Sequence, residues 1–157
     1  MKTAEDILND KPEKRKVCVS PQQTIAEAIR VMNDANVGAV LIDDGKDVAG
    51  IWTERDLLRS LGNAGFDPKT ALIGDHMKTR LHCAAHDAPL LQLEEMFLGL
   101  FIRHIVIKKQ GRFIGLLSIG DVLRASLLEK EAEFKKRNKI ASWNYYENWG
   151  WDRKKKG

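Results

Sequence analysis

The sequence has few cysteines and no long hydrophobic run. Cys18 and Cys83 are the only cysteines among 157 residues, which excludes a disulfide framework and favours a reducing compartment. The longest apolar runs, 37–42 and 97–102, fall far short of the ~20 residues that span a bilayer. Residues 1–6 include two acids where a secretion signal would have an apolar core. We therefore expect a soluble, cytoplasmic protein without a membrane span.

Net charge is also absent from most of the chain. Residues 1–128 hold 17 basic and 17 acidic residues, whereas residues 129–157 hold nine basic and five acidic ones, so the whole excess of +4 lies in the C-terminal part. A neutral body offers no basic groove, and we therefore do not expect the body to bind nucleic acid.

The residues of common catalytic and metal sites are present without the spacing that such sites need. His76, His82 and His86 lie within eleven residues of one another but lack the helical or cysteine spacing of a zinc site. A cysteine beside His104 is conceivable as a nucleophile with its base, yet no spacing supports this pair. We predict neither a metal site nor an enzyme.

What the sequence does contain is an internal repeat at an offset of 65 residues. Residues 50–58 align with residues 115–123, and the alignment runs back without a gap to Ile25 and Leu90. The aligned polar and glycine pairs are Gly50 with Gly115, Thr53 with Ser118, Asp56 with Asp121 and Arg59 with Arg124. Such a repeat predicts one duplicated supersecondary unit with the same polar site in each copy.

Each copy predicts the order strand, helix, strand, strand, helix, and hence an α+β fold in two pseudo-symmetric halves. The apolar run at 37–42 is expected to be a strand buried on both faces. Because ~60 residues are marginal for an independent core, the two sheets should pack against each other. The expected elements are strands at 17–19, 37–42, 48–52, 103–107 and 113–117, and helices at 24–36, 53–61, 89–101 and 118 to about 140.

Three residues of the repeat have two interpretations each. Cys18 and Cys83 occupy equivalent positions, and we interpret them as small buried hydrophobes, with a redox pair as the alternative. Trp52 directly precedes Thr53, and strand alternation directs it either into the core or into the cleft between the halves.

The repeated polar pairs, each a hydroxyl residue with an aspartate three positions later, lie where a strand passes into a helix. Thr53 with Asp56, and Ser118 with Asp121, have the spacing of a helix N-terminal cap, which is their simplest interpretation. A helix N-terminus also attracts phosphate, and an ionised aspartate accepts hydrogen bonds from neighbouring hydroxyls such as those of a ribose. The polar pairs therefore also suit a nucleotide.

These motifs resemble a tandem pair of cystathionine-β-synthase (CBS) domains, a Bateman module, of the small stand-alone kind. The most specific segments are 50–56, 115–121 and 102–107, and the segments 7–11 and 73–77 add to the likeness. The boundaries that follow are 1–16 for an N-terminal segment that completes the module, 17–62 for the first repeat, 63–81 for a linker with a helix, 82–128 for the second repeat, and 129–157 for a helical extension and tail.

The resemblance implies an adenosine ligand held between the two repeats. It assigns the carboxylates of Asp56 and Asp121 to the ribose, and the hydroxyls of Thr53 and Ser118 to the phosphate side. The remaining residues that it implies are Arg55, Arg103 and His104 near phosphate, and Val17, Cys18, Val19, Val37, Gly38, Cys83, Ala84 and Ile102 near adenine. Because Gly38 and Ala39 replace the Arg-His pair in the first repeat, we expect one good site, in the second.

The function that we predict is a regulatory sensor of adenine nucleotides that has no catalytic activity. AMP, ADP or ATP is the expected ligand, and NAD or S-adenosylmethionine remains open. The resemblance also implies a homodimer, through helices that carry Met32, Leu57, Leu58, Met96, Leu123 and Leu127.

The C-terminal tail leaves a second function open. Three of the four tryptophans and both tyrosines lie within residues 143–151, between Trp143 and Trp151. This segment either covers its own module or a dimer mate, or docks a protein partner, because Trp and Tyr dominate binding hot spots. Aromatic residues beside lysines also suit single-stranded nucleic acid or an anionic membrane surface, but Glu147 and Asp152 interrupt the segment and disfavour both. The alternative function is thus an interaction adaptor with vestigial nucleotide sites.

Overall fold

The computed structural model describes residues 1–11 and 17–137. The first repeat consists of β1 (Cys18–Val19), α2 (Ile25–Ala35), β2 (Ala39–Asp43), β3 (Val48–Thr53) and α3 (Glu54–Leu61). The second repeat consists of β4 (Cys83–Ala85), α5 (Leu90–Leu100), β5 (His104–Lys109), β6 (Arg112–Ser118) and α6 (Ile119–Arg137). Two short helices, α1 (Ala4–Asn9) and α4 (Ile73–His76), precede the repeats. The aromatic residues 143–151 lie outside the described residues.

The two repeats form separate three-stranded sheets with identical topology. The strand orders are β1-β2-β3 and β4-β5-β6, with the first pair parallel and the second antiparallel in each sheet. Ala39 pairs with Thr53 in one sheet and His104 pairs with Ser118 in the other, at the same offset of 65 that relates the sequences. Each central strand also has an irregularity at the same place, after Ile42 and after Ile107. The predicted duplication and α+β class are confirmed.

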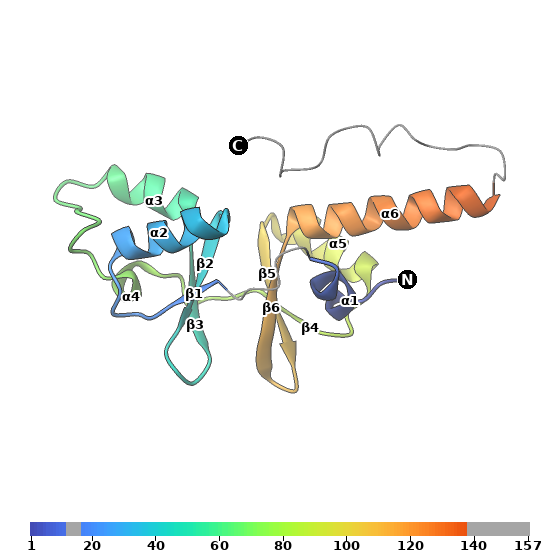
Figure 1. Cartoon of the computed structure of the whole chain (residues 1–157), viewed down its shortest axis with the longest axis horizontal. Coiled ribbons are helices and arrows are strands. Elements are labelled where there is room, and N and C mark those ends of the chain that lie inside the picture. Colours follow the sequence, from blue (N-terminus) through green and yellow to red (C-terminus); the bar gives the residue numbers. More distant parts are fainter. Residues whose placement is uncertain (12–16, 138–157) are drawn as a thin grey trace.

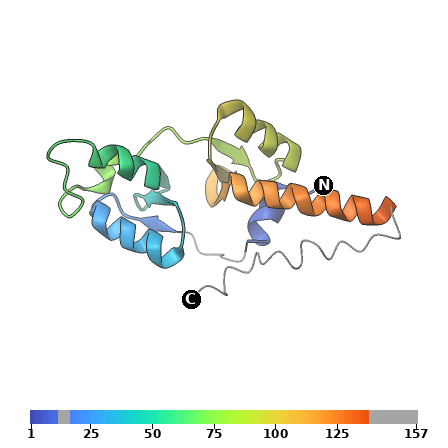
Figure 2. The same ribbon diagram turned by 90° about the horizontal axis from the view of Figure 1, so that it is seen from above.

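The sheets stand next to each other at the centre of the molecule, with the helices outside them (Figure 1). Figure 2 shows the same separation of the two repeats from above. Val40 and Ile42 of β2 point into the core of the first repeat. Ala39 and Leu41, on the opposite face of the same strand, are also buried, at 4% and 2% exposure. Both faces of this strand are therefore covered, as the apolar run predicts.

The first helix of each repeat, α2 or α5, ends in a residue with a positive φ. Thr24 caps the start of α2 and exchanges hydrogen bonds with Glu27, which forms a complete capping box. Asn36 ends α2 in the left-handed conformation, and Phe101, its equivalent in the second repeat, ends α5 at φ 50°. The left-handed turn lets the chain leave each helix and enter the central strand.

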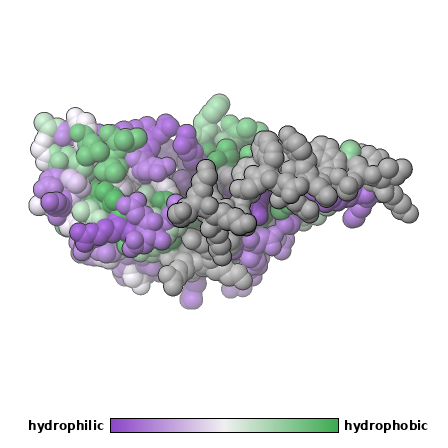
Figure 3. Space-filling model, turned by 45° about the horizontal axis from the view of Figure 1, so that its top comes forward, coloured by the Kyte–Doolittle hydropathy of each residue, from purple (hydrophilic) through white to green (hydrophobic). Residues whose placement is uncertain are grey.

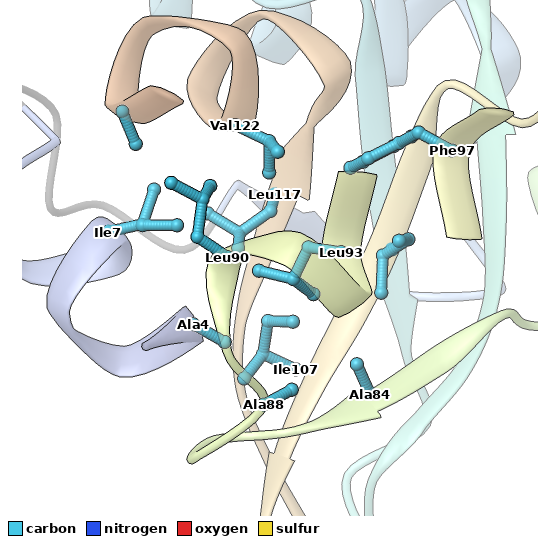
Figure 4. Packing of buried hydrophobic residues seen from close by; sticks show 12 residues of the cluster. Ala4, Ile7, Ala84, Ala88, Leu90, Leu93, Phe97, Ile107, Leu117 and Val122 are labelled. Carbon is cyan, nitrogen blue, oxygen red and sulfur yellow. The ribbon is translucent and has the colours of Figure 1, made fainter. Parts of the chain in front are cut away.

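Each repeat has a hydrophobic core of its own. In the first repeat, Trp52 is fully buried among Ile25, Val40 and Ile73, so its side chain belongs to the core rather than to the cleft. Figure 4 shows the core of the second repeat, where Leu93 and other side chains of α5 pack over β5 and β6. Such clusters stabilise each sheet because they remove apolar surface from water.

The segment that precedes each repeat in the sequence packs on the other repeat, so the two leading segments are exchanged. Ala4 and Ile7 of α1 lie in the core of the second repeat (Figure 4), although α1 precedes the first repeat in the sequence. Glu5 reinforces this packing, because its carboxylate accepts a hydrogen bond from Lys109 Nζ at 2.8 Å and lies 3.0 Å from His86 Nδ1. In the opposite direction, Ile73 of α4 is buried in the core of the first repeat.

At Gly50 and Gly115 the exchanged segments pack closely against the sheets. A Cβ at Gly50 would lie 2.5 Å from Sδ of Met77 and 3.0 Å from the carbonyl oxygen of Lys78. A Cβ at Gly115 would lie 2.7 Å from a methyl group of Leu8. Both glycines allow an exchanged segment to pack closely on the strand, and neither serves a turn.

We expect Gly50→Ala to lower the free energy of unfolding by about 1–3 kcal/mol, the usual cost of overpacking. Lys78 cannot yield easily, because its backbone forms two hydrogen bonds of 2.9 Å with Ile51. Gly115→Ala should cost less, since it meets only the side chain of Leu8, which can rotate. The control is Gly99→Ala on α5, where nothing lies within 4 Å and a gain of about 0.5–1 kcal/mol is expected. Denaturant unfolding of the three variants measures these differences, and a Gly50→Ala protein as stable as wild type would contradict the packing argument.

Candidate functional site

The two polar pairs, Thr53 with Asp56 and Ser118 with Asp121, form the same helix cap in both repeats. Thr53 and Ser118 each donate a backbone and a hydroxyl hydrogen bond to Oδ2 of the aspartate three residues later, over 2.7–3.0 Å. In return, the amides of Asp56 and Asp121 donate to these hydroxyls at 3.4 and 3.3 Å. The cap interpretation is therefore correct for both polar pairs. Any ligand has to bind to an aspartate that already accepts the cap hydrogen bonds of its helix.

A lysine from the exchanged segment reaches each of these aspartates. Lys78 Nζ lies 2.7 Å from Oδ1 of Asp56, and Lys11 Nζ lies 2.9 Å from Oδ2 of Asp121. Lys11 also donates to the carbonyl oxygen of Leu116 at 3.0 Å. The repeat alignment contained no signal for these lysines, because each contacts the repeat that does not follow it in the sequence.

The lysines and the cap hydroxyls keep both carboxylates ionised. Burial raises the pKa of Asp56 and of Asp121, which disfavours the charged form. The hydrogen bonds from Thr53 or Ser118 and the ammonium group of Lys78 or Lys11 outweigh burial, and both pKa values lie below the ordinary value for aspartate. The acceptor-only form that a ribose requires is thus the form present at neutral pH.

Arg103 and His104 lie beside the start of α6. The carbonyl oxygen of Arg103 accepts a hydrogen bond of 3.0 Å from the amide of Ile119, and His104 pairs with Ser118 across the sheet. Burial lowers the pKa of His104, and the charges of Lys11 and Arg103 act in the same direction, against the opposing charges of Asp121 and Glu54. His104 is therefore neutral at pH 7, so Arg103 and Lys11 supply the positive charge at this site.

The equivalent place in the first repeat is an open hollow without a basic lining residue. Glu54 donates its amide to the carbonyl oxygen of Gly38 at 3.0 Å and holds its carboxylate over that glycine, where a Cβ would lie 2.9 Å from Oε1. The hollow is lined by Met32, Asn33, Asn36, Val37, Gly38 and Glu54. Glu54 was not predicted as a site residue, although its alignment with Ile119 already shows a difference in charge between the two repeats.

The other residues that the resemblance implies lie close to the cores. Val19 and Ala84, in the first strands, are buried in the two cores, so they can offer a ligand only their backbone. Val37 and Ile102 are partly buried against the same cores, whereas Arg55 is exposed on α3. Val17, like Val37, packs against the core of the first repeat.

The interpretation of the cysteines as two buried hydrophobes is wrong. Cys18 is half-buried and Cys83 is exposed, whereas their neighbours Val19 and Ala84 are the residues that lie in the cores. No disulfide joins them.

Two of the three histidines within residues 76–86 have different partners. His86 pairs with Glu5, and the ring of His76 meets that of Phe66 edge-on, with centroids 5.4 Å apart. Among residues 1–11 and 17–137, no group of three or more His, Cys, Asp or Glu side chains is placed to hold a metal ion. Within the same ranges, no helix has the length and apolar character to cross a bilayer.

The charge of Asp121 gives the cap a defined pH dependence. Because its pKa is lower in the folded than in the unfolded protein, its ionised form contributes stability above about pH 4, which is lost as the pH falls through the folded pKa. We expect Asp121→Asn to lower the free energy of unfolding at pH 7 by about 1 kcal/mol, as for a lost cap.

This deficit should shrink as the pH falls below about 4, where the carboxylate becomes protonated first in the unfolded and then in the folded wild-type protein. Denaturant unfolding at a series of pH values measures the effect. Asp34→Asn is the control, because it removes an exposed carboxylate that takes part in neither cap. A deficit for Asp121→Asn that does not change with pH would contradict the assignment.

Comparison with known proteins gives one consistent result. The family model of the CBS domain matches the chain twice, over residues 4–63 and 73–128. The mitochondrial CBS domain-containing protein CBSX3 of Arabidopsis thaliana is 32% identical over 127 residues, which are 78% of this chain and 62% of the relative. The chain thus spans less than two thirds of the length of that relative.

Solved structures show the same architecture. A CBS-domain containing protein from Agrobacterium tumefaciens is 31% identical, with a TM-score of 0.71 over 79% of this chain and 98% of that chain. A CBS domain protein from Pyrobaculum aerophilum, solved in complex with AMP, is 24% identical, with a TM-score of 0.68 over 81% of this chain and 96% of that chain. At this lower identity, the likeness concerns the fold.

Proposed function

The chain belongs to the CBS domain family, and from this premise we propose that it is a regulatory module that binds an adenine nucleotide at the start of α6. The observation that carries the proposal is the pair of equivalent Thr/Ser–Asp caps, each placed at a strand end beside a helix N-terminus. An ionised carboxylate suits ribose hydroxyls, and a helix N-terminus suits phosphate. The AMP complex of the Pyrobaculum protein supports the same class of ligand.

The second repeat has the more suitable surroundings for a phosphorylated ligand. Arg103 and Lys11 bring positive charge to the start of α6, where the helix dipole also favours an anion. Gly120, in the first turn, leaves space in front of the helix, because a Cβ there would meet only Ser118 Oγ, at 3.7 Å. We assign the ribose to Asp121 and the phosphate to the region of Ser118 and Arg103.

Thermal unfolding and calorimetry with AMP, ADP, ATP, NAD and S-adenosylmethionine test this proposal. A ligand at a hundredfold excess over its dissociation constant stabilises the folded protein by ~2.7 kcal/mol. We expect such stabilisation for wild type and its loss for Asp121→Ala and Ser118→Ala. Asp34→Ala, which changes an exposed residue far from both caps in the sequence, should behave as wild type. If none of the five compounds raises the wild-type midpoint, the proposal is wrong.

We further propose that the module forms a homodimer through α3 and α6. Leu58 and Leu123, which are equivalent in the repeat, are 70% and 58% exposed, and Leu127 is 51% exposed. Figure 3 shows hydrophobic residues at the surface of both repeats on one face. The other three residues expected on this face, Met32, Leu57 and Met96, pack into or against the cores of their own repeats, where α2, α3 and α5 meet the sheets.

Leu123→Glu should convert the dimer to a monomer, because it places a charge within the proposed interface. Sedimentation velocity measures the change in mass. Leu91→Glu is the matched control, since Leu91 is 56% exposed but lies in the first turn of α5, where a negative charge is favourable. A wild-type monomer, or a Leu123→Glu variant that remains a dimer, would contradict the proposed interface.

A further inference from the structure

We infer that Lys78 closes the first of the two equivalent sites, so that each chain binds one nucleotide, through Asp121. This inference rests on the proposed function, because it concerns which of the two caps is available to the ligand. It also identifies Lys78, a residue of the linker between the repeats, as the side chain that decides the number of ligands.

Both carboxylate oxygens of Asp56 are in use. Oδ2 accepts the backbone and hydroxyl hydrogen bonds from Thr53, at 3.0 and 2.9 Å, and Oδ1 receives Lys78 Nζ at 2.7 Å. The side chain of Asp56 is also only 8% exposed. A ribose hydroxyl that approached Asp56 would therefore have to displace Lys78 or compete with it.

Asp121 uses the same cap but only one of its oxygens. Oδ2 accepts from the amide and the hydroxyl of Ser118, at 2.8 and 2.7 Å, and also receives Lys11 Nζ at 2.9 Å. Within the part of the chain that the structure describes, Oδ1 of Asp121 has no hydrogen-bond partner, and this side chain is 22% exposed. One carboxylate oxygen thus remains for the two hydroxyls of a ribose.

The charges around the two caps also favour the second site for a phosphorylated ligand. The carboxylate of Glu54 stands at the start of α3, over Gly38, and repels a phosphate there. At the equivalent positions of the second repeat, Ile119 carries no charge and Arg103 carries a positive one. The difference in charge and the difference in free oxygens therefore both favour the second site.

Lys78 is held in place by the linker rather than by its side chain alone. Its backbone forms two hydrogen bonds with Ile51, and its carbonyl oxygen packs against Gly50. The ammonium group therefore stays close to Asp56 even though the side chain is 52% exposed. Removal of the ammonium group should free Oδ1 of Asp56 without unfolding the linker.

Equilibrium dialysis with radiolabelled AMP measures the number of ligands per chain. We expect one for wild type, one for Asp56→Asn, and at least a tenfold loss of affinity for Asp121→Asn, as when hydrogen bonds to a charged group are lost. Lys78→Met should bind a second AMP, more weakly than the first because Glu54 remains, and this second binding is lost again when Asp56→Asn is added. Arg80→Met is the control, because it removes a charge from the same linker two residues further on.

Two AMP molecules bound to the wild-type chain, or one bound to Lys78→Met, would overturn the inference and leave the proposed function intact. Absence of AMP binding to wild type and all variants would instead overturn both.

A measurement without ligand tests the closure separately. Carbon-13 titration of the carboxyl groups should show a higher pKa for Asp56 in Lys78→Met and no change for Asp121. An unchanged Asp56 would overturn the closure.

Discussion

Each repeat depends on one carboxylate that must first satisfy the start of its own helix. In both repeats Oδ2 of the aspartate accepts two hydrogen bonds from the residue that caps the helix. These bonds join the last residue of a strand to the first turn of a helix, and so fix the point at which sheet and helix meet. Any other role for the aspartate depends on what the cap leaves available, which is why the position of a single lysine distinguishes Asp56 from Asp121.

Much of the fold could be predicted because the duplication shows which features belong together. The gapless alignment of residues 25–58 with residues 90–123 predicted the same order of helices and strands in both repeats, and the structure has these elements in that order. The exchange of α1 and α4 between the repeats could not be predicted. Local patterns report which face of a helix is apolar, but not which of two similar sheets that face will cover.

The candidate site was predictable only where chemistry is carried by the repeated residues. Thr53, Asp56, Ser118 and Asp121 could be identified from their spacing, and the structure places each of them at a helix start. Lys11 and Lys78 could not, because long side chains from an exchanged segment leave no periodic signal. The cysteines were misjudged for a related reason: a strand of two or three residues alternates too briefly to show which side faces the core.

The exchange of leading segments also bears on how such a pair of repeats can exist. A single repeat on its own would carry a helix that does not cover its own sheet, and Gly50 or Gly115 would lack the segment that packs against it. Two separate chains with one repeat each would have to lend these segments to each other, as domain-swapped dimers do. Joining the repeats in one chain makes that exchange intramolecular, so assembly of the pair no longer depends on protein concentration.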